Sequence, residues 1–219
     1  MTTTDSISQK KKTSGLASGL EPHRLAALID GIFAIAMTIL VLNIVVPPLK
    51  NGPPTEGEFL NLLYSLRHHL INYGASFILL GVFWLVHHQQ MHFIKRTDSW
   101  HMWANLIGLV LVCLVPFSSS LMGEYHHLIS AAVVFEINMF LIGIAFYFQW
   151  SYATNGHRLV DGDLDRSVIV KGRRLNLVLV AVCAIAPFLA LYDPRYSLLT
   201  FILIPATIGF FRKKLFLVY

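Results

Sequence analysis

The sequence predicts an all-α integral membrane protein, and three observations support this fold class. Of the 219 residues, 55% are hydrophobic and 13% are charged, about half the ~25% charged content of ordinary soluble domains. The mean hydropathy is +0.61. The hydrophobic residues are grouped into stretches, most of them near the ~20 residues that a helix needs to cross a bilayer. We therefore expect a protein surrounded by lipid.

The first element is a polar N-terminal segment, residues 1–22, which we expect to be a disordered cytoplasmic tail. It is rich in Ser, Thr, Gly and Lys and contains no apolar core of a signal peptide. The apolar stretch of residues 25–46 follows and is long enough to cross a core of ~30 Å. Because no small-residue cleavage site follows it, we expect this span to remain in the mature protein.

Six spans are predicted within a transmembrane domain of residues 23–211, and residues 212–219 form a short cytoplasmic C-terminus. The five later apolar stretches comprise residues 66–86, 100–121, 128–150, 175–191 and 198–211. The sixth is short and contains Pro205. Because proline removes a helical hydrogen bond, a tilted or kinked helix and a re-entrant segment are alternatives to a full sixth crossing.

Positive charges predict the orientation of the spans. If the N-terminus is cytoplasmic, fourteen Lys and Arg residues lie on that side, and three, Lys50, Arg67 and Arg195, lie on the other. Lys and Arg concentrate in cytoplasmic loops, so both termini are expected in the cytoplasm. These residues form short clusters rather than a continuous basic face, so nucleic acid is not an expected partner despite the net charge of +5.

Polar residues inside the spans are candidates for function, because an unpaired charge in lipid costs several kcal/mol. Two acids qualify, Asp30 and Glu136. Asp30 shares its predicted depth with polar residues of the next two spans. We expect one cytoplasmic-side polar layer formed by Arg24, Asp30, Trp84, His87, His88 and Asn105. It is either a hydrogen-bonded clasp between three helices or a relay for protons or ions.

One stripe of the first span is a candidate pore lining. Gly31, Ile35, Thr38 and Leu42 recur at spacings of four, three and four residues, which places them on one helical face. One interpretation is a packing stripe in which the Thr38 hydroxyl donates to the carbonyl one turn earlier. The other is a pore, with Ile35 and Leu42 as apolar constrictions around a ring of Thr38 hydroxyls. A pore requires several copies around a symmetry axis, because one helix cannot enclose an aqueous path.

Clustered histidines raise the alternative of a membrane di-iron oxygenase. They lie at positions 68–69, 87–88 with 92, and 126–127. The predicted topology places the middle cluster ~30 Å from the other two, so they cannot share one metal centre, and we expect neither an enzyme nor a cofactor. Cys113 and Cys183 lack zinc-ligand spacing. The sequence also shows no inverted repeat, Arg-rich voltage sensor or Thr-Val-Gly-Tyr-Gly filter.

The first span resembles a known family. Arg24-Leu-Ala-Ala-Leu28-Ile29-Asp30 and the apolar continuation to Leu42 resemble the opening helix of the transmembrane protein 175 family of potassium channels. The family motif is Arg, three residues, then Phe-Ser-Asp. The resemblance extends to Trp84-x-x-His87-His88, to Asn105 and to Leu114-Val115-Pro116-Phe117, and so covers about the first 120 residues. This chain has Leu28-Ile29 in place of Phe-Ser, so the clasp is weaker or is rebuilt with His23 or His88.

The resemblance implies a six-helix subunit of a prokaryotic homotetramer without a pore loop, in which the first helix of each subunit lines a central pore. Carried over to this chain, Ile35 is the main hydrophobic constriction. Thr38 forms a polar layer tied to potassium preference, and Leu42 forms a second apolar ring. Arg24 and Asp30 join the first helix to the next two.

We therefore expect a homotetrameric, weakly potassium-selective cation channel of a prokaryotic plasma membrane. Its partners would be copies of itself, membrane lipid and monovalent cations, chiefly potassium as the permeant ion. The alternative is a proton-conducting or proton-coupled transporter that uses Asp30 and the cytoplasmic-side histidines. A structural membrane subunit without transport is a third hypothesis.

Overall fold

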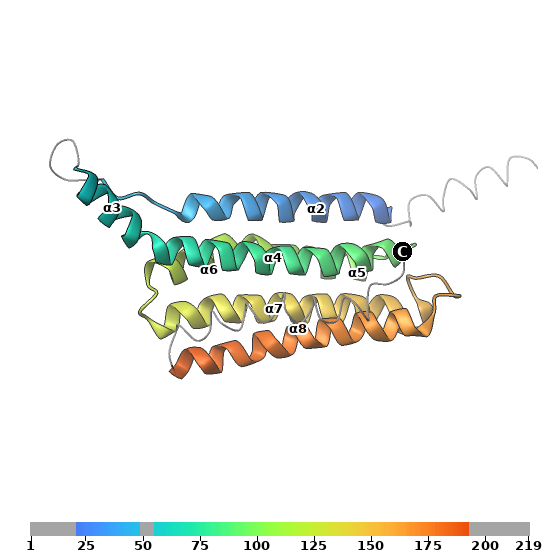
Figure 1. The fold of residues 1–219 in the computed structure, drawn as a ribbon. Coiled ribbons are helices and arrows are strands. Elements are labelled where there is room, and N and C mark those ends of the chain that lie inside the picture. Colours follow the sequence, from blue (N-terminus) through green and yellow to red (C-terminus); the bar gives the residue numbers. More distant parts are fainter. Residues whose placement is uncertain (1–20, 49–54, 193–219) are drawn as a thin grey trace, which may run out of the picture.

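The computed structural model describes residues 21–48 and 55–192 and shows a bundle of long helices that run side by side (Figure 1). In this part of the chain, five segments are long and apolar enough to cross a membrane: Pro22–Asn43, Arg67–Phe93, Ser99–Glu124, Ile129–His157 and Arg166–Tyr192. Each coincides with one of the first five predicted spans, which confirms the all-α membrane fold here. The predicted sixth span and the terminal tails lie outside the described residues.

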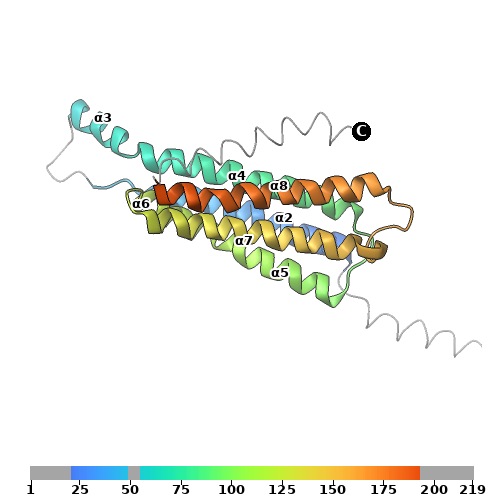
Figure 2. The same cartoon turned by 90° about the horizontal axis from the view of Figure 1, so that it is seen from below.

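The helices follow one another along the chain with short connections. In order they are α2 (Pro22–Ile39), η1 (Leu40–Asn43), α3 (Glu56–Ser65), α4 (Arg67–Phe93), α5 (Ser99–Cys113), α6 (Val115–Glu124), α7 (Ile129–Thr154), η2 (Asn155–His157) and α8 (Arg166–Tyr192). Helix α2 packs on α4 and α5 at one side of the bundle, and α7 and α8 pair at the other (Figures 1 and 2).

One face of α2 is buried and the opposite face is exposed. The buried residues recur every three or four positions, as expected for one side of a helix, and are Leu25, Ile29, Phe33, Ala36 and Leu40. The α-helix ends earlier than the predicted span, because residues 40–43 form a 3₁₀ turn and residues 44–48 are not helical. Pro47 and Pro48 prevent the helix from continuing through residue 46, since a residue before proline avoids the helical conformation.

The third span consists of two helices instead of one. Helix α5 ends at Cys113, and α6 begins at Val115 with Pro116 in its first turn. Proline has no backbone N–H, and its ring clashes with the carbonyl four residues earlier, so the helix breaks here. The apolar pattern alone, which is continuous across residues 100–121, does not show this break.

Two helical segments extend beyond the apolar pattern. Helix α8 begins at Arg166, although the predicted apolar stretch begins at residue 175. Hydropathy marks only the part of a helix within the hydrocarbon layer, so polar turns at its ends are missed. Helix α3 was not predicted either. Its capping box, in which Thr55 and Glu58 bond each other's backbone N–H, is the sequence signal that could have found it.

The connection between α7 and α8 is joined to the segment after α4 by backbone hydrogen bonds from Lys95 and Arg96 to the Leu159 carbonyl and by the Arg96 side chain. The Arg96 guanidinium donates to the backbone carbonyls of His157, Arg158 and Val160 at 3.0–3.2 Å. The adjacent turn contains Gly156 and His157, both with positive φ. Arg96 therefore supplies hydrogen-bond donors to carbonyls that would otherwise lack partners in this irregular turn.

Candidate functional site

A carboxylate on α2 joins this helix to α4. Oδ1 of Asp30 accepts a hydrogen bond of 2.8 Å from the Trp84 indole and lies 3.3 Å from Nδ1 of His88. The side chains of His88 and Asp30 are 53% and 39% exposed, so their ion pair contributes little stability by itself. We call this group the Asp30 clasp. It connects two helices, α2 and α4.

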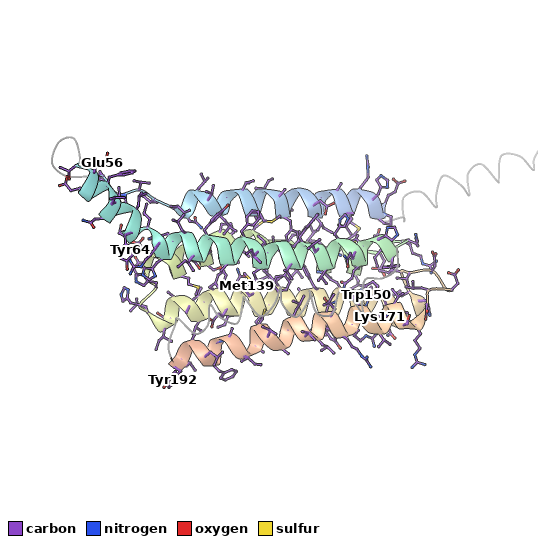
Figure 3. The ribbon with its side chains drawn as sticks, in the orientation of Figure 1. Glu56, Tyr64, Met139, Trp150, Lys171 and Tyr192 are labelled. Carbon is purple, nitrogen blue, oxygen red and sulfur yellow. The ribbon has the colours of Figure 1, made fainter. Side chains whose placement is uncertain are left out.

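A second, buried group connects α4, α5 and α7. The Nε2 atom of His87 lies 3.1 Å from Oδ1 of Asn105 and 2.9 Å from Oε1 of Gln149. Asn105 also contacts His101 one turn earlier on α5, with Nδ2 3.3 Å from Nε2 of His101. We call these four residues the His87 cluster. They lie near the end of the bundle where Figure 3 labels Trp150 and Lys171, opposite Tyr64 and Tyr192.

The structure therefore differs from the prediction of one polar layer. Two clusters form because His87 and His88 are consecutive, and consecutive side chains on an α-helix point about 100° apart. Arg24 belongs to neither. It is exposed at the start of α2, and its guanidinium forms no ion pair with another described residue.

Sequence reasoning missed two members of the His87 cluster, Gln149 and His101. Gln149 was inside the predicted fourth span, where an amide group needs a partner, and its Nε2 also donates to the carbonyl of Ala104 at 2.8 Å. His101 lies at the start of the predicted third span, residues 100–121. A polar residue within an apolar stretch is the signal that could have indicated these residues. The sequence does not say, however, which side of one helix faces another.

Two further histidines, His68 and His126, form a separate contact at the Tyr64 end of the bundle. The imidazole rings of His68 and His126 stack with centroids 4.3 Å apart and planes 9° apart. This pair joins the start of α4 to the connection before α7. The histidines of the two ends do not meet, in agreement with the predicted topology.

The Tyr64 end also has buried hydrogen bonds, which the sequence analysis did not identify. Asn72 of α4 donates to the backbone carbonyl of Ser119 at 2.6 Å, and Asn138 of α7 donates to the Ser118 hydroxyl at 3.1 Å. Asn43, at the end of the 3₁₀ turn η1, donates to the carbonyl of Pro116 at 2.7 Å. The first span is therefore held at two points, by the Asp30 clasp at the middle of α2 and by Asn43 at the end of η1.

The predicted pore stripe lies on the exposed face of α2 and η1. Ile35 is 59% exposed and Leu42 is 73% exposed, and Gly31 and Thr38 are exposed as well. The Thr38 hydroxyl donates to the carbonyl of Ile35 at 2.8 Å. This is the bond that the packing interpretation expected, but the four residues of the stripe are exposed and not buried against the other described helices. The stripe is available to other copies, to water or to lipid.

Comparison with known proteins places the chain in a family. Residues 24–116 match the family described as "Endosomal/lysosomal potassium channel TMEM175". The potassium channel B446_29190 of Streptomyces collinus is 33% identical over 151 residues, which are 66% of this chain and 70% of that protein. The chain belongs to the TMEM175 family. This confirms the resemblance noted in the first span.

Other TMEM175 proteins agree in sequence and fold. The potassium channel Cha6605_3372 of Chamaesiphon minutus is 37% identical over 149 residues, which are 67% of this chain and 72% of that protein. The crystal structure of a lysosomal potassium-selective channel TMEM175 homolog from Chamaesiphon minutus superimposes with a TM-score of 0.73 at 29% identity, over 84% of this chain and 95% of that chain. The Gallus gallus endosomal/lysosomal proton channel TMEM175 is 27% identical over 146 residues, which are 63% of this chain and 29% of that protein.

The start of α5, which positions His101 and Asn105, depends on Asp98. Its Oδ1 accepts from the His101 backbone N–H at 2.8 Å, and its Oδ2 accepts from the Tyr152 hydroxyl at 2.7 Å. Partial burial acts to raise the pKa of Asp98, but these two hydrogen bonds outweigh it and hold the pKa below its usual range. The ionised carboxylate of Asp98 thus stabilises the folded state.

We predict a stability loss at acidic pH that depends on Asp98. Because the folded pKa is depressed, its stabilisation is complete above the ordinary Asp pKa of about 3.9 and is lost as the pH falls through the lower, folded value. Thermal unfolding in detergent should show a higher Tm for the wild type than for Asp98→Asn at pH 7, and the difference should shrink toward pH 3. Asp163→Asn, in the α7–α8 connection, is the control. A difference that does not change with pH would contradict this role.

Proposed function

We propose that this chain is the subunit of a homotetrameric, weakly potassium-selective cation channel in a prokaryotic plasma membrane. The observation that carries the proposal is the exposed face of α2 and η1, where Ile35 and Leu42 are among the exposed apolar side chains, in a chain whose bacterial relatives are potassium channels. Four copies arranged with this face toward a central axis would enclose a path that one subunit cannot form.

The Thr38 hydroxyl is suited to meet a cation along this path. Its hydrogen is donated to the carbonyl of Ile35, so the lone pairs of the oxygen are left to face the axis. Four such oxygens would replace part of the hydration shell of a potassium ion. Selectivity should be modest, because hydroxyls on side chains form a softer cage than rigid backbone carbonyls.

Ile35 and Leu42 would be apolar rings on either side of Thr38. A hydrophobic constriction of small radius loses its water, and the dry gap then opposes the passage of ions. Ile35 lies on the regular helix and Leu42 on the 3₁₀ turn beside Asn43. We take Ile35 as the candidate gate. Leu42 would form a second ring, and its position depends on the bond between Asn43 and Pro116.

Conduction through such a pore needs no catalytic residue and no bound cofactor. The chain is a multi-pass membrane protein of a channel family, and we propose that it is not an enzyme. Both termini would be cytoplasmic, as the distribution of Lys and Arg predicts. The Trp150 end of the bundle, which also carries Lys171 (Figure 3), is then the cytoplasmic end.

Thr38→Ala tests the selectivity layer. We expect the permeability ratio of potassium over sodium to fall by about two- to fivefold, as expected if about 0.5–1 kcal/mol of ion–dipole discrimination is lost, while conduction is preserved. The ratio is measured as flux from potassium-loaded liposomes with external potassium or sodium. Ser65→Ala is a matched control, because Ser65 on α3 makes the same bond to a carbonyl three residues earlier. An unchanged ratio would remove Thr38 from the filter.

Ile35→Asn tests the constriction. A polar amide at this ring should keep the gap hydrated and so increase potassium flux in the same liposomes. Ile107→Asn, on α5 and outside the stripe, controls for the general effect of an added amide, because Ile107 is 60% exposed and Ile35 is 59% exposed. Loss of all current from a variant that still assembles as a tetramer would count against the gate.

The alternative function is proton conduction or proton-coupled transport through Asp30 and the histidines at the Trp150 end of the bundle. The contact between Asp30 and His88 favours it, because it places two titratable groups on α2 and α4 within hydrogen-bond distance. Vertebrate relatives are also named proton channels.

Asp30→Asn separates the two functions. If protons pass through this carboxylate, flux driven by a pH gradient should collapse, because the amide cannot take up a proton. If the chain is a potassium channel, potassium flux without a pH gradient should persist. Trp84→Phe is the matched control, since it removes the other hydrogen bond to Asp30 and keeps the acid. Equal loss of both fluxes in both variants would indicate only a structural role for the Asp30 clasp.

A further inference from the structure

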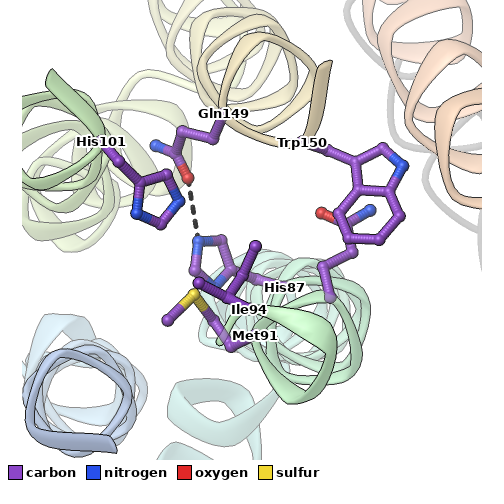
Figure 4. A pocket seen from close by; sticks show the side chains of 7 residues that line it. His87, Met91, Ile94, His101, Gln149 and Trp150 are labelled. Carbon is purple, nitrogen blue, oxygen red and sulfur yellow. Dashed lines mark hydrogen bonds between the residues drawn. The ribbon is translucent and has the colours of Figure 1, made fainter. Parts of the chain in front are cut away.

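A side-chain hydrogen bond joins η1 to α6 at the Tyr64 end of the bundle. Nδ2 of Asn43 donates to the backbone carbonyl of Pro116 at 2.7 Å. At the other end, the His87 cluster joins α4 to α5 and α7 (Figure 4), and α2 contributes no residue to it. The Asn43 bond therefore acts on the first span itself, next to the exposed side chain of Leu42.

The geometry of η1 directs Asn43 and Leu42 to different sides. Side chains three residues apart align in a 3₁₀ helix, so Asn43 lies on the same side of the turn as Leu40, which is fully buried. Leu42 lies about 120° away and is 73% exposed. Residues 44–48 are not helical, so no further helical turn holds η1 in place. The bond of Asn43 thus draws η1 into the bundle, away from the side on which Leu42 is exposed.

The acceptor of this bond belongs to a helix that is itself held by buried hydrogen bonds. Asn72 of α4 donates to the backbone carbonyl of Ser119 on α6 at 2.6 Å. Asn138 of α7 donates to the hydroxyl of Ser118 on α6 at 3.1 Å. Both contacts lie within one helical turn of Pro116, so its carbonyl has a fixed position relative to α4 and α7.

We propose that Asn43 is a positioning residue that keeps the ring of Leu42 side chains open in the assembled channel. The inference rests on the proposed function, which arranges Leu42 of four copies around one axis. Apolar side chains that face water are stabilised by contact with one another, so four Leu42 side chains tend to come together and close the path. The bond from Asn43 to Pro116 opposes this movement, because it holds each η1 turn against its own subunit.

Asn43→Ala tests the positioning role through potassium flux from loaded liposomes. Without the bond, the Leu42 side chains should approach one another. Flux should then fall by about two- to tenfold, which is the change in an equilibrium that loss of one ordinary hydrogen bond produces. Asn176→Ala is the matched control and should retain its flux, because Asn176 on α8 donates to the Phe146 carbonyl on α7, a bond of the same kind away from η1.

A second substitution separates positioning from a general loss of stability. Leu42→Ala removes most of the side chain that closes the path, so Leu42→Ala combined with Asn43→Ala should conduct at least as well as the wild type. If the Asn43 bond only stabilised the fold, the double variant would conduct as poorly as Asn43→Ala. Low flux in the double variant, or unchanged flux in Asn43→Ala, would overturn the proposal.

Disulfide cross-linking tests the position of Leu42 without reference to conduction. The background is Cys113→Ser, because Cys113 is an exposed free cysteine. Under mild oxidation, Leu42→Cys should form disulfides between copies, and the addition of Asn43→Ala should at least double the rate. Equal rates in the two variants, or no disulfide in either, would overturn the proposal. Faster cross-linking with Asn43→Ala, in a protein whose wild type passes no potassium, would support the positioning role and reject the proposed function.

Discussion

Lipid offers no hydrogen bonds, and this constraint determines where the polar residues of the chain lie. Every polar group in the hydrocarbon layer needs a partner from the protein. The described helices meet this need in buried groups toward their two ends, around His87 at one end and around Asn72 and Ser119 at the other. Between them the interior is mostly apolar, and the Phe146 ring contacts the rings of both Phe33 and Phe83. Polar bonds thus set the register of the helices, and apolar packing fills the middle.

The same arrangement explains how α2 can be both anchored and exposed. Its buried face packs on α4 and α5, Asp30 is bonded at its middle, and Asn43 is bonded at the end of the following 3₁₀ turn. The opposite face therefore keeps a fixed position although its side chains are largely exposed in the described part of the chain. A helix that lines a pore needs this combination, since its side chains must face ions while its backbone is held by the remainder of the subunit.

The sequence predicted the elements that depend on one-dimensional patterns. Hydropathy located the first five spans, because burial in lipid requires long apolar runs. It did not locate the break at Pro116 or the 3₁₀ turn before Pro47, which depend on local backbone chemistry. Depth predicted that His87 and Asn105 meet. Depth could not show that His88 and His87 join different clusters, or that Gln149 contacts His87. Such contacts depend on the rotation of each helix about its own axis, which a single sequence does not reveal.

Arg96 shows that one residue can satisfy two unrelated requirements. During synthesis, its positive charge belongs to the asymmetry that orients the spans, and for that purpose lysine would serve equally well. In the folded protein, its guanidinium bonds three carbonyls of the α7–α8 connection at once. The single ammonium of lysine cannot reproduce that fork. Membrane insertion thus depends on the charge of residue 96, and the folded bundle depends on the shape of its side chain. Replacement of Arg96 by lysine would leave the insertion unaffected but would disturb the folded structure.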